Sequence, residues 1–237
     1  MLRSILFGIL FYATTVLFLV FGLPLLVLPL KWAMAALKLH ARTELWLLKH
    51  IVGLDFEVRG LDKLPEAPFL VASKHQSAWE TFALTPLFSD PALFMKRELF
   101  WIPVHGWFSY KFGMIPVDRD KGAAALRRML NVAKERIATG REIIMFPEGT
   151  RRPPGAPPEY KTGIALLYSG LGVPCVPVAL NSGVFWARRS WTRKPGKIVV
   201  EILDPIPPGL PKVEFLSRLQ EAIETASNTL LAETKGP

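Results

Sequence analysis

Apolar residues are concentrated at the beginning of the chain. From Ser4 to Leu30 there is no charged residue across 27 positions. One straight helix of that length would measure about 40 Å, against about 30 Å for the hydrocarbon core of a bilayer. Pro24 and Pro29 predict that this helix is interrupted before the run ends. The run is too long for a cleaved signal peptide, and no small-x-small cleavage site follows it, so it predicts an uncleaved membrane anchor.

Residues 31–50 combine large apolar side chains with basic ones, as an amphipathic helix in a membrane interface does. The apolar members are Trp32, Met34, Leu37, Leu45, Trp46 and Leu48, and the basic members are Lys31, Lys38, Arg42 and Lys49. Only Arg3 precedes the apolar run, so the positive-inside bias places the bulk of the chain in the cytoplasm. Whether the anchor spans the bilayer or enters and returns stays open.

The remaining pattern alternates strands with helices. Short apolar runs that suit buried strands lie at 56–58, 69–72, 92–95, 114–117, 142–146, 176–180 and 198–203. Apolar residues at helical spacing occur between 126 and 137, with Gly140 as the stop, and again between 213 and 230. We therefore predict an α/β fold: a single domain at 51–237, with a mostly parallel or mixed central sheet flanked by helices, after a membrane-anchoring helical segment at 1–50.

Composition narrows the kind of partner. The chain carries 29 basic and 20 acidic residues, a net charge of +9, and 50% of its residues are hydrophobic. A basic, apolar chain favours an anionic partner, which is nucleic acid, an anionic membrane surface or an acidic substrate. The single cysteine, Cys175, excludes an internal disulfide, and its apolar neighbours predict a core residue.

The first segment that suggests chemistry is 73–80, directly after a predicted strand. His75 and Glu80 lie five positions apart, about 140° around a regular helix, so they meet only if His75 lies on the turn before the helix. The carboxylate would then accept one ring N–H and leave the other ring nitrogen to take a proton. By itself the pair is better explained as a polar turn at a helix start.

Three further segments follow other predicted strands. Phe146-Pro147-Glu148-Gly149-Thr150-Arg151 combines a glycine that permits close backbone approach with an arginine fork that suits phosphate, and Lys161 follows a Pro-rich surface loop at 152–158. The run 113–119 ends in Arg119, which would join Arg151 in one anion site. The run 176–181 contains Pro177, which predicts an edge strand or a bulge.

In this order, the four segments resemble the four sequence blocks of the glycerolipid acyltransferase family, of His-x4-Asp type. The likeness is closest to the bacterial 1-acyl-sn-glycerol-3-phosphate acyltransferases and covers residues 69–180. The resemblance implies that His75 is the general base and Glu80 its orienting partner. It places Glu148, Gly149 and Arg151 at the phosphate-side pocket, with Arg119 helping. Thr150 and Lys161, which follow in the sequence, complete the predicted substrate-binding residues. The family block usually ends in Asp, whereas this chain has Glu80.

The implied reaction moves an acyl group from acyl-CoA or acyl carrier protein to the sn-2 hydroxyl of lysophosphatidic acid, giving phosphatidic acid in phospholipid biosynthesis. We expect no covalent enzyme intermediate, no cofactor and no metal, and a place at the inner (cytoplasmic) membrane with the catalytic domain on the cytoplasmic side. Backbone amides after His75 would stabilise the oxyanion. Ser73 and Ser77 raise the rival of a serine nucleophile, although no Gly-x-Ser-x-Gly elbow is present.

Two other functions stay open. One is an acyltransferase for another lyso-lipid acceptor, and the other is a non-catalytic basic protein that binds membrane or nucleic acid. Residues 188–197 carry basic side chains beside Trp186 and Trp191, which could stack on single strands or lie at a lipid interface. With an apolar anchor in the same chain the pattern favours the lipid interface, and no nucleic acid is expected.

Overall fold

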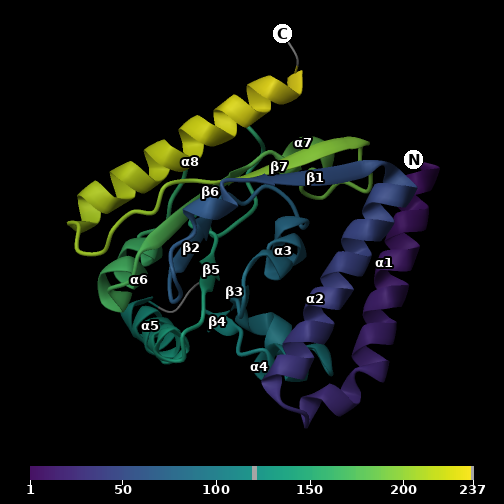
Figure 1. The fold of residues 1–237 in the computed structure, drawn as a ribbon, viewed down its shortest axis with the longest axis horizontal. Coiled ribbons are helices and arrows are strands. Elements are labelled where there is room, and N and C mark those ends of the chain that lie inside the picture. Colours follow the sequence, from purple (N-terminus) through teal and green to yellow (C-terminus); the bar gives the residue numbers. More distant parts are fainter. Residues whose placement is uncertain (119–121, 236–237) are drawn as a thin grey trace.

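The computed structural model describes residues 1–118 and 122–235 and contains one seven-stranded sheet (Figure 1). The strand order is β1-β7-β6-β2-β5-β3-β4. Every predicted strand is present, with bounds shifted by a few residues: β1 (Leu54–Arg59), β2 (Leu70–Ser73), β3 (Ala92–Lys96), β4 (Ile115–Val117), β5 (Ile143–Met145), β6 (Cys175–Leu180) and β7 (Gly196–Ile202). All pairs are parallel except β6–β7, so the predicted mixed α/β sheet is confirmed.

Helices cover both faces of this sheet, and the side chains of one strand show how the faces divide. In β2, Leu70 and Ala72 pack toward α5 (Gly122–Ala138), α6 (Gly163–Leu171) and α8 (Lys212–Lys235). Val71 points to the opposite face, which the N-terminal helices cover (Figure 1). A strand buried on both faces reads as a continuous apolar run rather than an alternating one, which is why the pattern at 69–72 could be recognised.

The N-terminal helices form an antiparallel pair (Figure 1), which we call the helical hairpin. It consists of α1 (Leu2–Phe21), the short 3-10 helix Leu23–Leu26 and α2 (Leu30–Leu47), followed by the π-helical turn Leu48–Val52. The break falls at the two prolines, since Pro24 lies in the 3-10 helix and Pro29 caps α2 with an extended backbone. The predicted interruption is therefore confirmed.

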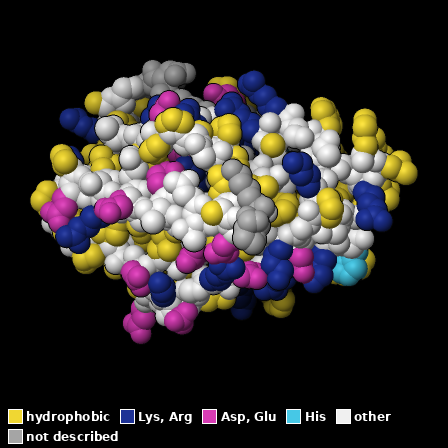
Figure 2. Space-filling view, turned by 90° about the horizontal axis from the view of Figure 1, so that it is seen from above, with side chains coloured by type: hydrophobic (Ala, Val, Ile, Leu, Met, Phe, Trp, Pro, Cys, Tyr) yellow, Lys and Arg dark blue, Asp and Glu magenta, His cyan; other side chains and the backbone are white. Residues whose placement is uncertain are grey.

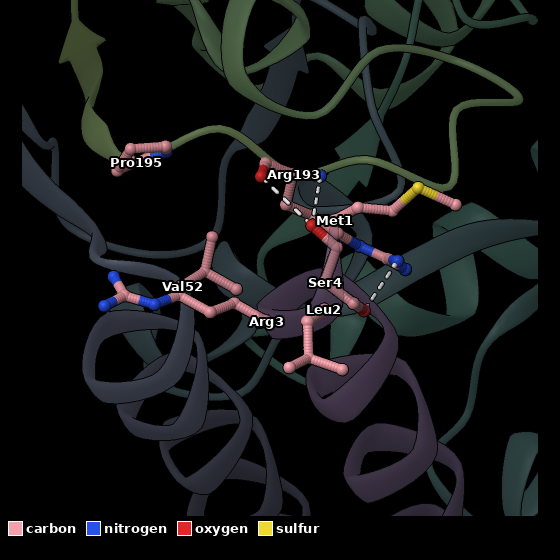
Figure 3. A pocket seen from close by; sticks show the side chains of 7 residues that line it. All are labelled: Met1, Leu2, Arg3, Ser4, Val52, Arg193 and Pro195. Carbon is pink, nitrogen blue, oxygen red and sulfur yellow. Dashed lines mark hydrogen bonds between the residues drawn. The ribbon is translucent and has the colours of Figure 1, made fainter.

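The hairpin packs against the sheet domain along the length of α1. At its N-terminal end, Ser4 Oγ donates to the carbonyl of Arg193 (3.2 Å) and accepts from its N–H (2.9 Å), as Figure 3 shows. Phe7 is fully buried, edge-on to Trp186 (5.7 Å). At the other end, Phe18 packs on Phe108 (5.6 Å) of α4 (His105–Lys111). Because both ends are held, α1 is a docked helix rather than a free tail.

The outward side of α1 stays apolar. Among the described residues, α1 is the helix long and apolar enough to cross a membrane, and only 11% of its apolar window is buried. Its exposed large side chains are Leu2, Ile5, Leu6, Ile9, Tyr12, Val16, Leu17, Val20 and Phe21. Figure 2 shows hydrophobic side chains projecting at the end of the molecule that the hairpin forms. Such an exposed apolar surface indicates contact with lipid or another apolar partner.

Two expectations were wrong, one of them in part. Pro177 was expected to mark an edge strand or a bulge, and the edge alternative is wrong because β6 lies between β7 and β2. The Pro177 carbonyl accepts a hydrogen bond from the Leu203 N–H (3.0 Å). Proline has no N–H to donate on that side, but the chain opposite it has already left β7, which ends at Ile202. Trp186 is only 6% exposed and carries the Arg193 guanidinium on its ring (4.5 Å), so it cannot stack on a base, whereas Trp191 is exposed.

Candidate active site

The predicted motifs meet at one edge of the sheet because their strands are parallel neighbours. Ala72 of β2 pairs with Met145 of β5, so the loops that follow both strands leave the sheet side by side. Strand β6 runs parallel to β2 on its other side, with Ser73 opposite Val178. The carboxyl ends of such strands are where open α/β sheets bind ligands. Three segments therefore share this edge: the histidine loop (residues 74–79), the Phe146–Arg151 loop, and the corner after β6 (residues 181–183).

His75 and Glu80 contact each other directly. Glu80 begins the short helix α3 (Glu80–Ala83) and reaches back so that His75 Nδ1 lies 2.9 Å from its Oε1. The His75 ring also stacks on Phe146, with 4.2 Å between centroids. With Nδ1 donating to a carboxylate, Nε2 is the basic nitrogen, and it has no hydrogen-bond partner among the residues that the structure describes. The turn that brings the two side chains together was predicted.

The Glu80 carboxylate is fully buried and its orientation is fixed by several donors. Oε1 accepts the backbone N–H groups of Gln76 (2.7 Å) and Ser77 (2.6 Å), besides the histidine. Oε2 accepts the hydroxyl of Ser182 (2.8 Å), which lies on α7 (Ser182–Phe185). Unspecified backbone amides after His75 were expected to stabilise an oxyanion, and the structure commits those of Gln76 and Ser77 to Glu80.

Glu148 supports the same loop from the neighbouring strand. One oxygen lies 2.9 Å from Lys74 Nζ and the other accepts the backbone N–H of His75 (3.0 Å). Burial raises the pKa of Glu148, and the Lys74 ammonium acts in the opposite direction. Because both oxygens have protein partners, the geometry favours a role for Glu148 in holding the histidine loop.

Lys74 is a buried cation that the sequence did not single out. It is 2% exposed and contacts a second carboxylate, Glu224 Oε1 of α8, at 2.6 Å. The Tyr160 hydroxyl donates to the same oxygen (3.0 Å). The network joins the histidine loop to a helix about 150 positions further on. In the sequence, Lys74 is distinguished only by its position next to His75, and that position does not indicate that its side chain is buried.

The Gly149–Arg151 turn lies beside this network. Gly149 has φ +64°, in the left-handed region that favours glycine, and a Cβ there would lie 3.6 Å from Lys161 Cγ. Thr150 is half-buried and Lys161 is exposed. Arg151 is half-buried; burial lowers its pKa, while the negative charge of Glu80 raises it. Gly149 and Lys161 are therefore neighbours, and Arg151 lies two residues further along the same turn.

The predicted second arginine, Arg119, lies outside the described residues. The described end of this segment is Asp118, which is paired with Arg97 and lies 3.6 Å from Arg128. The sequence did not single out either cation: Arg97 directly follows β3, and Arg128 lies within α5.

The serine rival is not supported by the geometry. Ser73 and Ser77 are fully buried. The hydroxyl of Ser73 donates to the carbonyl of Lys74 (3.1 Å), and that of Ser77 accepts from Trp79 N (3.2 Å). A serine nucleophile needs its hydroxyl on the base, and neither of these bonds reaches the His75 ring. Cys175 is fully buried too, as predicted, and burial raises the pKa of its thiol.

Comparisons with known proteins identify the family of the chain. A family model described as acyltransferase matches residues 55–181. The chain is 37% identical to a 1-acyl-sn-glycerol-3-phosphate acyltransferase of Pseudomonas aeruginosa over 161 residues, which is 68% of this chain and 63% of that protein. It is 29% identical to the human 1-acyl-sn-glycerol-3-phosphate acyltransferase alpha over 163 residues, 68% of this chain and 58% of that one. The matches thus span less than two thirds of these relatives.

A solved structure shares the whole fold. The 1-acyl-sn-glycerophosphate acyltransferase of Thermotoga maritima superposes with a TM-score of 0.81 at 23% identity, covering 98% of this chain and 97% of that one. The protein described here belongs to the acyltransferase family.

Proposed function

We propose that this protein transfers an acyl group from a thioester, acyl-CoA or acyl carrier protein, to the free sn-2 hydroxyl of 1-acylglycerol 3-phosphate. The observation that carries the proposal is the 2.9 Å contact between His75 Nδ1 and Glu80 Oε1, with Nε2 left as the basic nitrogen. Family membership and the names of the relatives support the substrate class. The product would be phosphatidic acid, a precursor of membrane phospholipids.

In the reaction we propose, His75 Nε2 takes the proton of the sn-2 hydroxyl as that oxygen attacks the thioester carbonyl carbon. Glu80 stabilises the imidazolium and keeps Nδ1 protonated, as the carboxylate of a Ser-His-Asp triad does. The tetrahedral intermediate collapses by breaking the carbon–sulfur bond, and His75 returns its proton to the leaving thiolate. An ester and a free thiol result, without a covalent enzyme intermediate.

The phosphate of the acceptor would bind at the Gly149–Arg151 turn. Arg151 supplies a planar fork of donors, Gly149 permits close approach of the backbone, and Lys161 lies next to Gly149, with Thr150 as a further candidate donor on the turn. Glu148 has a supporting role in this proposal, because both of its oxygens already have protein partners.

The helical hairpin would attach the protein to the cytoplasmic side of the inner membrane, with residues 1–50 as anchor and 51–237 as the catalytic domain. The exposed apolar side of α1 supports lipid contact. Because α1 is held to the domain at both ends, the active-site edge would keep a fixed height above the bilayer.

An acyl-transfer assay with purified protein tests this function. A panel of lyso-lipids is offered with acyl-CoA and with acyl carrier protein as donor. We expect transfer to lysophosphatidic acid to exceed transfer to lyso-lipids with larger head groups at least 10-fold in kcat/KM. A higher kcat/KM for another lyso-lipid would reassign the acceptor, and no transfer from either donor would refute the function.

A further inference from the structure

The corner after β6 contacts the His75–Glu80 pair through Ser182, which is not one of the proposed catalytic residues. Ser182 opens α7 and is fully buried, and its hydroxyl donates to Glu80 Oε2 at 2.8 Å. Three N–H groups, from His75, Gln76 and Ser77, converge on the other oxygen, Oε1. The serine therefore holds the end of the carboxylate that the loop itself does not hold.

A second contact fixes the distance between this corner and the loop. Gly183 N–H donates to the side-chain oxygen of Gln76 (3.0 Å). A Cβ at Gly183 would lie 2.9 Å from Gln76 Cβ and equally close to Pro154, so the position requires glycine. The corner approaches the loop as closely as backbone permits, which places the Ser182 hydroxyl within reach of Glu80.

The corner is itself anchored. The side chain of Asn181 accepts Val199 N–H (2.8 Å) and donates to the Thr234 hydroxyl (2.8 Å), which ties it to β7 and α8. Ser182 thus projects from a fixed platform rather than from a mobile loop. A rigid support of this kind is what a precisely oriented side chain needs.

The length of the Glu80 side chain allows it to contact His75 and Ser182 at the same time. Compared with an aspartate at the same position, Glu80 has one more methylene, which adds about 1.5 Å of reach. The longer side chain places Oε1 on the His75 ring and carries Oε2 across to α7. Shortened to Asp, the carboxylate would keep one of these contacts but not both.

We propose that Ser182 is a positioning residue for the His75–Glu80 pair, and that its contact depends on the reach of the glutamate side chain. The serine acts through Glu80 and touches no substrate. Its hydroxyl prevents rotation of the carboxylate about its last bond, so Oε1 stays on Nδ1 while His75 gains and loses its proton. This inference rests on the proposed acyl transfer.

A double-mutant cycle tests it with wild type, Ser182→Ala, Glu80→Asp and the double variant. A hydrogen bond to a charged group is worth enough to change a rate about 10-fold or more. We expect Ser182→Ala to lower kcat roughly 10-fold in the wild-type background with both KM values within twofold. In the Glu80→Asp background, the same substitution should lower kcat less than twofold, because the shorter carboxylate no longer reaches the serine.

Ser227→Ala is the matched control, since Ser227 is 4% exposed and its hydroxyl has no hydrogen-bond partner in the described part of the chain. It should leave kcat unchanged in both backgrounds. Should Ser182→Ala fail to fold, Ser182→Cys keeps the side-chain volume with a much weaker donor, and the same cycle applies.

An equal loss in both backgrounds, or no loss in either, would overturn the role of Ser182. His75→Ala separates this failure from failure of the proposed function. If that variant is inactive while the cycle is additive, only the serine inference falls. If it keeps full activity, the His75–Glu80 pair is not catalytic and the serine inference falls with it, whereas the acyl-transfer function falls only if the wild-type protein transfers no acyl group from either donor.

Discussion

Glu80 in the histidine loop and Glu44 in the helical hairpin are buried to the same extent, at 0% and 1% exposure, but their surroundings differ. Both oxygens of Glu80 accept hydrogen bonds, from His75, two backbone amides and Ser182. On Glu44, Thr14 donates to Oε1 and His40 lies 3.5 Å from the same oxygen, while Oε2 has no partner among the described residues. Burial alone therefore does not say what a carboxylate does.

The difference has a physical consequence. Desolvation raises the pKa of Glu44 to about 7, and the Thr14 hydroxyl offsets only part of it. Burial also lowers the pKa of His40, so the pair does not form a strong ion pair near neutral pH. The Glu80 site is instead a preorganised set of donors around one carboxylate, which is the arrangement a histidine base needs. Four predictions sharpen this contrast.

The largest effect is expected from removing the charge at Glu80. Glu80→Gln should lower kcat by up to about 10⁴, because the amide offers the wrong tautomer partner to the ring. Glu80→Asp keeps the charge and should lose up to about 10²-fold through misplacement of about 1 Å. The order of kcat is therefore wild type, Glu80→Asp, Glu80→Gln.

Glu44→Gln is the matched control and should leave kcat within twofold of wild type. A Gln variant at position 80 that equals the Asp variant would show that Glu80 is a helix cap rather than part of a dyad.

The next effect concerns the buried cation beneath the histidine. Lys74→Met leaves Glu148 and Glu224 without their ammonium, and removing one partner of a buried pair costs about 3–5 kcal/mol of unfolding free energy. Chemical unfolding in detergent measures this loss. Lys63→Met is the control, because its ion pair with Asp204 is exposed and surface pairs contribute at most about 1 kcal/mol. Equal losses at the two positions would refute the support role of Lys74.

The raised pKa of Glu44 predicts that its contribution to folding stability changes with pH in the opposite direction to that of most carboxylates. Its folded pKa lies above the unfolded value of 4.5, so the folded state binds the extra proton and its contribution to stability falls as pH rises from 4.5 to about 7. The shift corresponds to about 3 kcal/mol. Glu44→Gln should match wild type below pH 4.5 and exceed it in unfolding free energy above pH 7. A constant difference across this range would contradict the assignment.

The smallest effect is expected at the phosphate. Arg151→Ala should raise KM for the lysophosphatidic acid acceptor roughly 10-fold while KM for the donor changes less than twofold, since a charge-assisted bond is worth about 1.5–3 kcal/mol. Arg152→Ala is the adjacent control, because Arg152 bonds to Pro157 O and Glu159 on the Pro-rich loop. A rise in donor KM alone would place the arginine at the other substrate.

Local sequence patterns predicted the elements and much of the site, because those features depend on neighbours in the chain. Buried strands appear as short apolar runs, and a five-residue spacing after a strand is enough to place His75 and Glu80 on one turn. The supporting contacts were not predictable in this way. Lys74–Glu224 and Ser182–Glu80 join positions 150 and 102 residues apart, and a lone lysine or serine has no pattern that reveals its partner.

Pro177 also shows that the sequence of a strand does not predict which strands lie beside it. Proline in a strand predicts an edge when only the strand's own sequence is considered. The structure places Pro177 inside the sheet. The missing N–H is tolerated there because the chain on that side has left β7 by Leu203. Such exceptions are set by the path of a distant segment.

The most direct test of the account is kcat for His75→Ala with saturating acyl donor and lysophosphatidic acid, in protein whose folding is verified by circular dichroism. General acid–base catalysis contributes about 10² to 10⁴ in rate, so kcat should fall by that factor. Activity within threefold of wild type would contradict the assignment of His75 as the base.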